Sequence, residues 1–172
     1  NDGQLRRLLE SRPLRFAFQD GIVSSVCPDR DEEPAALNIK RGLLSALQNS
    51  MNALQGKQDV QEADVTGICD TKYEVSSSGY WGPKTIKRSK DLMSCTGRHS
   101  YAGSLQSVKY HLPSEMQAVP LMKSEHECEQ QVNKDIIMSS VCREKHVFRP
   151  FSSDSSGAVT TVSQKLNFKN SQ

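Results

Sequence analysis

The sequence lacks most of the features by which functional classes are usually identified. Its 172 residues carry a net charge of only +2, which is too small to indicate nucleic-acid binding on electrostatic grounds. It has no apolar run long enough to cross a bilayer, and residues 1–10 lack the apolar core of a signal peptide. It contains no Asn-x-Ser/Thr glycosylation acceptor, Gly-rich phosphate loop, HExxH motif or GxSxG motif. The sequence therefore gives no argument for an enzyme, and it predicts no cofactor and no resident metal.

Apolar residues are also scarce. They make up 35% of the chain, which is low for a compact domain of this length. We therefore expect either that much of the surface is loop or that residues 1–172 form one part of a larger assembly.

The clearest periodic pattern lies at residues 35–56. Apolar residues recur there at intervals of three and four, the spacing that forms one face of a helix. Pro34 can occupy the first helical position, and Gly56 lies where a left-handed residue would end the helix. Gln48 should lie about 100° from the centre of the apolar stripe. The buried stripe of this central helix is predicted to consist of Ile39, Leu43, Leu44, Leu47, Met51 and Leu54.

The other periodic segments alternate with the period of two that is typical of strands. Residues 14–27 contain two such runs separated by Asp20-Gly21, which indicates a hairpin with a type I′ turn. Residues 64–95 contain a second pair of runs, and residues 124–168 form the C-terminal strands. Residues 96–120 show little periodicity and are predicted to form a loop. Together with one long helix, this pattern predicts a mainly β domain, a sheet or barrel wrapped around the helix.

Five cysteines occur, and none forms a CxxC pair. Cys69 and Cys95 lie in the two arms of the second strand pair, so a disulfide between them would close a hairpin. Cys128 and Cys142 are separated by 14 positions in the C-terminal strands, and a hairpin there could bring them within bridging distance. Disulfides are our preferred interpretation for both pairs. The spacing alone leaves other connectivities open, including those that involve Cys27.

A metal site is the alternative for the second pair. His126 and Cys128, together with Cys142 and His146, could supply four tetrahedral zinc ligands, as in a zinc-dependent hydrolase. We expect the disulfide instead, because the two thiols are predicted to face each other across a hairpin.

A short basic cluster lies in the returning strand of the second pair. Its members are Lys84, Lys87, Arg88 and Lys90. Such a cluster can bind a heparin-like polyanion, an anionic lipid or the acidic face of a receptor. It can also be the solvated edge of a sheet, where lysines discourage edge-to-edge pairing. The sequence leaves both interpretations open.

Four segments resemble, in the same order, motifs of the large lipid transfer proteins. That family includes vitellogenin, apolipoprotein B, apolipophorin and the microsomal triglyceride transfer protein. The last segment is more similar to apolipoprotein B and apolipophorin than to vitellogenin. The resemblance extends over about residues 14–168. The segments are Arg15–Val23, Leu37–Ser50, Asp64–Tyr73 with Lys90–Cys95, and Cys142–Ser152.

The resemblance implies a fold and a disulfide pattern. It implies a lipovitellin N-sheet-like antiparallel β-barrel wrapped around the central amphipathic helix. Residues 1–172 would form a single domain, a partial amino-terminal barrel of a much longer secreted polypeptide. It also implies the pairs Cys69–Cys95 and Cys128–Cys142, with the state of Cys27 open.

The resemblance further implies lipid transport in the extracellular space. The chain would serve as a scaffold and as a docking module for a receptor or other partner, while the remaining parts of the parent polypeptide hold most of the lipid. A yolk lipoprotein segment of the vitellogenin type is one alternative. A free-standing small-molecule carrier is another, but a helix at residues 35–56 would occupy its cavity.

Overall fold

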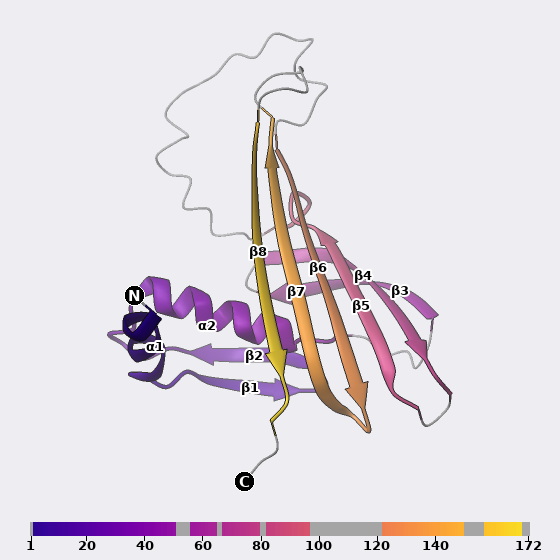
Figure 1. Ribbon diagram of the computed structural model, residues 1–172, viewed down its shortest axis with the longest axis horizontal. Helices are drawn as coiled ribbons and strands as arrows, with labels where there is room; N and C mark the ends of the chain where they lie inside the picture. The colour runs from indigo at the N-terminus through magenta and orange to yellow at the C-terminus, as the bar shows by residue number, and fades with distance from the viewer. Residues whose placement is uncertain are drawn as a thin grey trace.

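The computed structural model describes residues 2–50, 56–64, 67–79, 82–96, 122–149 and 157–169. These residues form a two-stranded antiparallel sheet and a six-stranded antiparallel sheet, whose strands β3 to β8 neighbour one another in chain order (Figure 1). The elements are α1 Asp2–Glu10, β1 Arg15–Gln19, β2 Ile22–Cys27, α2 Pro34–Leu47, β3 Gly56–Asp64, β4 Gly67–Ser77, β5 Lys84–Asp91, β6 Met122–Asn133, β7 Ile136–Phe148 and β8 Ala158–Asn167.

The sheets are open, which corrects the prediction of a barrel. Within the described residues, the six-stranded sheet ends at β3 and at β8, and neither edge pairs with the other or with β1–β2. The prediction of one long helix is also not confirmed, because two helices are present. The unexpected helix α1 spans nine residues, and an apolar pattern that short gives little periodic signal.

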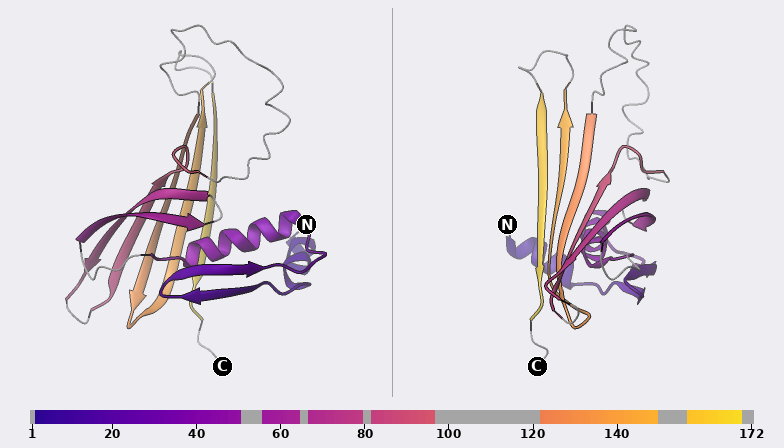
Figure 2. Two further views of the ribbon diagram at one scale, coloured as in Figure 1. Left: turned by 180° about the vertical axis from the view of Figure 1, so that it is seen from behind. Right: turned by 90° about the vertical axis from the view of Figure 1, so that its right-hand side faces the viewer.

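Helix α2 lies on one face of the six-stranded sheet, and the β1–β2 hairpin runs alongside it (Figure 2). We call the face covered by α2 the inner face and the opposite face the outer face. Strand β4 shows the division clearly, because its residues alternate between buried and exposed. The buried residues of the inner face include Cys69, Thr71, Tyr73, Arg88, Lys90, His126, Cys128, Gln130, Ser140 and Cys142.

Helix α2 is shorter than predicted. It ends at Leu47, and Gln48 has an extended backbone with φ −70° and ψ 138°. The predicted core residues Met51 and Leu54 lie outside the described residues. Gln48 was expected beside the stripe, yet its side chain is almost fully buried.

The buried side of α2 also differs from the predicted stripe. Leu44 is buried, whereas Leu43 and Leu47 are half-buried. Ile39 is 39% exposed, so its assignment to the core was wrong. The helix is buried mainly near its C-terminal end, where the consecutive residues Leu44, Ser45 and Ala46 are all buried. Burial therefore follows the position along the helix more than a single face of it.

This difference predicts a contrast between two leucine-sized residues of α2. We expect Leu44→Ala to lower the free energy of unfolding by about 2–5 kcal/mol, because it removes a buried side chain and leaves a cavity. We expect Ile39→Ala to cost less, about 1 kcal/mol, because Ile39 already has 39% of its surface exposed. Urea unfolding of both variants measures the difference, and equal losses would contradict this description of the helix.

The β1–β2 hairpin turns at Asp20-Gly21. Both residues have positive φ, 51° and 78°, as a type I′ turn requires. Gly21 is also approached closely by the segment that follows α2, because a Cβ atom there would lie 2.0 Å from the Asn49 carbonyl oxygen. The Asn49 N–H donates to the Gly21 carbonyl at 2.7 Å. The turn therefore joins the hairpin to the exit of the helix.

Candidate functional site

The candidate site is the junction between the end of α2 and the inner face of the sheet. We define residues Ser45–Ser50, the last helical residues and those that follow, as the helix-exit segment. The last four carbonyls of a helix have no partner within the helix. Here side chains of the sheet supply the missing donors.

Three strands donate to the end of α2 through Arg88, Gln130 and Ser140. Arg88 on β5 donates from Nη2 to the Ser45 carbonyl at 2.8 Å and from Nη1 to the Gln48 carbonyl at 2.9 Å. The Ala46 carbonyl accepts from Gln130 Nε2 on β6 at 2.9 Å and from Ser140 Oγ on β7 at 2.7 Å. These bonds cap the helix from the side of the sheet.

The helix-exit segment also donates to the sheet. Ser45 Oγ donates to Asp64 Oδ2 at 3.0 Å, and Gln48 Nε2 donates to the Ala63 carbonyl at 2.9 Å. The Ser50 N–H donates to Tyr73 Oη at 3.0 Å. Five neighbouring strands, β3 to β7, therefore contact this short segment through hydrogen bonds.

Beneath the segment lies a buried ion cluster, formed by Glu62, Asp64, Arg88 and Lys90. Glu62 Oε1 lies 3.1 Å from Arg88 Nη1 and 3.1 Å from Lys90 Nζ. Lys90 also pairs with Asp64, and Tyr73 donates its hydroxyl to Glu62. Two carboxylates face two cations, so the charge is balanced when all four are ionised. Removing one partner from such a buried set leaves an uncompensated charge.

Burial and the charges of the cluster shift the pKa values of Glu62 and of its neighbours Tyr73 and His126. Burial by itself would raise the pKa of Glu62, but the cations of Arg88 and Lys90 and the hydrogen bond from Tyr73 hold that pKa below its usual value. Burial and the neighbouring Glu62 carboxylate raise the pKa of Tyr73 to about 12. Burial, followed by the nearby Arg88 and Lys90, lowers the pKa of His126 to about 4. At neutral pH His126 is therefore uncharged, and Tyr73 remains a donor.

The four residues of the basic cluster do not form one surface. Lys84, Arg88 and Lys90 share one parity along β5, and Lys87 has the other. Arg88 and Lys90 are 2% and 4% exposed, because they point inward to Glu62 and Asp64. Lys87 is exposed on the outer face, and Lys84 is half-buried at the start of the strand. The period-two alternation of β5 could have shown this division, but the acidic partners on β3 were not recognised.

The structure contains the disulfides Cys69–Cys95 and Cys128–Cys142, and Cys27 is a free, exposed thiol. Ligand atoms of His126 lie within 4.8 Å of the sulfurs of Cys128 and Cys142. The disulfide uses both of these thiols, so they cannot act as thiolate ligands.

His146 does not join this group. Its two ring nitrogens lie 2.8 Å from Ser124 Oγ and 2.6 Å from Glu144 Oε1. The four-ligand arrangement proposed from the sequence is therefore not present.

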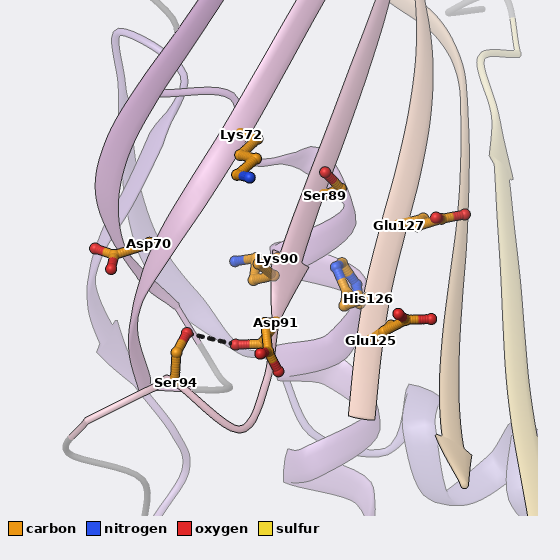
Figure 3. Close-up of a pocket in the computed structure, with 9 residues that line it drawn as sticks. All are labelled: Asp70, Lys72, Ser89, Lys90, Asp91, Ser94, Glu125, His126 and Glu127. Carbon is orange, nitrogen blue, oxygen red and sulfur yellow. Dashed lines mark hydrogen bonds between the residues drawn. The ribbon is translucent and has the colours of Figure 1, made fainter. Parts of the chain in front are cut away.

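The outer face carries charges of both signs. A concavity of about 360 Å³ lies at β4, β5 and β6, and Figure 3 shows its lining, in which the inner-face residues Lys90 and His126 join outer-face residues such as Lys72 and Glu127. A second concavity, of about 670 Å³, extends from β3 to β7. Across its strands, partners in register alternate in sign in the row Lys57, Glu74, Lys87 and Glu129. Such a mixed surface does not favour a simple polyanion.

Among the described residues, no helix is long and apolar enough to span a membrane.

Comparison with known proteins gives consistent similarities. Residues 3–172 match the family model described as the vitellogenin N-terminal domain. Vitellogenin of Penaeus merguiensis is 32% identical over 84% of this chain and 5% of its own length. Apolipophorins of Manduca sexta are 32% identical over 90% of this chain and 4% of their length. Apolipoprotein B-100 of Rattus norvegicus is 26% identical over 98% of this chain and 4% of its length.

A solved structure is also similar in fold. It is described as lipid–protein interactions in lipovitellin, and it superposes with a TM-score of 0.74 at 20% identity. The superposition covers 100% of this chain and 19% of that one. This chain thus spans a small fraction of the proteins that it resembles.

Proposed function

Because this chain belongs to the vitellogenin N-terminal domain family, we propose that it forms the amino-terminal module of a secreted, extracellular lipid-transport protein. The support is the similarity over most of the chain to apolipophorins and apolipoprotein B-100. Those relatives are far longer, so the transport of lipid would be a property of the longer polypeptide and not of these residues alone.

Within that protein the module acts as a scaffold. The observation that carries this proposal is the seating of α2 on the inner face, where hydrogen bonds and ion pairs fill the junction. A lipid chain needs an apolar cavity, whereas this face presents Arg88, Glu62 and Gln130. A free-standing carrier that binds its ligand beneath α2 is therefore disfavoured.

The outer face is the surface that we assign to a partner. It is solvated and carries alternating charges, with Lys87 beside Glu74 and Glu129 in register. Heparin would place its negative charges against Glu74 and Glu129 as well as Lys87. A protein partner with charges of both signs can place an opposite charge against each of these residues. We therefore assign the docking role to a protein receptor.

Among the family members, the run from Cys142 to Ser152 favours an apolipophorin or apolipoprotein B type over a yolk vitellogenin type. Recovery of the protein in circulating fluid would support this assignment, and its restriction to egg yolk would contradict it.

Photoactivatable lipid cross-linking in the natural-length protein tests the scaffold role. We expect the protein to carry lipid and the cross-links to fall outside residues 1–172, with few in α2. Absence of bound lipid would overturn the transport proposal. Cross-links concentrated in α2 and on the inner-face strands would instead show that this module holds lipid itself.

A further inference from the structure

The contact between α2 and the sheet depends unusually little on apolar burial. Among the described residues, the buried apolar side chains of α2 are Ala36, Leu44 and Ala46, and two of these are alanines. Ala46 packs against the Cys128–Cys142 disulfide. Hydrogen bonds from polar and charged side chains of the sheet therefore supply a large share of what holds the end of the helix in place.

Several ionisable groups surround the helix-exit segment, and they come from different strands. The segment itself contributes only hydroxyl, amide and backbone groups, and the nearby inner-face residue of β8 is the uncharged Gln164, which donates to the Gly42 carbonyl at 3.2 Å. The ionisable inner-face groups are Glu62 and Asp64 on β3, Tyr73 on β4, Arg88 and Lys90 on β5, His126 on β6, and the half-buried pair Glu144 and His146 on β7.

We propose that this junction is acid-sensitive: protonation of His126, and at lower pH of Glu62, releases the helix-exit segment from the inner face, while the six strands remain paired. The proposal concerns regulation of the fold and does not depend on the carriage of lipid.

The charge balance of the cluster explains the release. At neutral pH the carboxylates of Glu62 and Asp64 offset Arg88 and Lys90, and His126 is neutral. Acid first favours a positive charge at His126, beside Arg88 and Lys90, and at lower pH it removes the negative charge of Glu62, so like charges would accumulate in a site shielded from water. Admitting water relieves this repulsion. Arg88 also bonds the Ser45 and Gln48 carbonyls, so hydration of Arg88 frees the end of α2.

The direction of the pH dependence follows from the lowered pKa values of His126 and Glu62. His126 has a docked pKa of about 4, below its ordinary 6.5, so the released state binds the proton first as the pH falls. The docked state therefore loses stability between these two values. The pKa of Glu62 is also lowered in the docked state, so its contribution is lost as the pH falls through that lowered pKa. Both groups act in the same direction.

The sheet itself is better protected against acid. Cys128–Cys142 joins β6 to β7, and Cys69–Cys95 joins β4 to the segment after β5. The antiparallel ladders between the strands consist of backbone hydrogen bonds, which do not titrate. Local opening of α2 is therefore expected before the strands separate.

Hydrogen exchange in the natural-length protein, corrected for intrinsic rates, tests the proposal. Between about pH 7 and about pH 4.5, we expect the protection of amides 45–50 to fall about tenfold or more, while that of β6 and β7 changes less than about threefold. Glu62→Gln should reduce the protection of amides 45–50 already at pH 7. His126→Gln should move the transition to lower pH. Glu127→Gln, on the outer face of β6, is the matched control and should behave as wild type.

Three results would overturn the proposal. The first is unchanged protection of amides 45–50 down to about pH 4. The second is loss of protection in α2 and in β6–β7 at the same pH, which would indicate global unfolding. The third is an unaltered transition in His126→Gln. This last variant keeps the test decisive even if Glu62→Gln fails to fold, because it retains all four members of the ion cluster.

Discussion

Replacing Arg88 with alanine should destabilise the protein by about 3–5 kcal/mol, the cost of breaking a buried ion pair. The guanidinium is 2% exposed and lies between Glu62 and the end of α2. Its removal takes a charged donor from the Ser45 and Gln48 carbonyls and one of two cations from Glu62, all in a buried site. Lys90 still contacts Glu62, so the loss should not exceed this range.

Lys87→Ala is the matched control for this prediction. Lys87 is the preceding residue of the same strand, but it points to the outer face and is exposed. Its removal should change the free energy of unfolding by less than about 0.5 kcal/mol. Urea unfolding at neutral pH compares the two variants. Similar losses for both would mean that the inward position of Arg88 contributes little.

Features fixed by local chemistry were predictable from the sequence. The turn at Asp20-Gly21 needs two residues that tolerate positive φ, and its dipeptide is among the strongest hairpin signals. A hairpin between Cys128 and Cys142 was also expected, and β6 and β7 pair there through a turn in which Lys134 and Asp135 have positive φ. In both places the information lies within a few neighbouring residues.

Strand β3 was missed because its inner face is polar. A half-buried strand is recognised by apolar residues at every second position. In β3 the inward positions include Val60, Glu62 and Asp64, so the alternation carries charge where an apolar residue is expected. These inward charges are compensated by Arg88 and Lys90 of β5. The pairs Glu62–Arg88 and Asp64–Lys90 are each separated by 26 positions in the chain. Local patterning cannot show such a pairing.

The end of α2 was mispredicted for a related reason. Nothing in the sequence from Gln48 to Ser50 forbids another helical turn, and Gly56 offered a plausible stop. The helix ends at Leu47 because side chains of the sheet bind the residues that follow. Arg88 donates to the Gln48 carbonyl, and the Ser50 N–H donates to Tyr73 Oη. Tertiary contacts thus override helix propensity at the position where the candidate site is built.

Removing the buried disulfide is the second change with a large expected effect. The double variant Cys128→Ala/Cys142→Ala should lower the free energy of unfolding by about 3 kcal/mol, the entropy of closing a loop of this length in the unfolded chain. The closed loop spans 14 positions, and both cysteines are almost fully buried against Ala46. Arg88 Nη2 would also lose its contact with the Cys128 sulfur, 3.2 Å away.

Cys27→Ala provides the control, because Cys27 is exposed and unpaired, and we expect this variant to unfold like the wild type within about 0.5 kcal/mol. Thermal and urea unfolding without reductant compare the variants. Adding a reductant to wild type should cost more than the double variant does, because it also opens Cys69–Cys95, whose loop spans 26 positions. If the double variant were as stable as Cys27→Ala, the β6–β7 pair would be held by its backbone ladder alone, and the bridge would add no constraint to the unfolded chain.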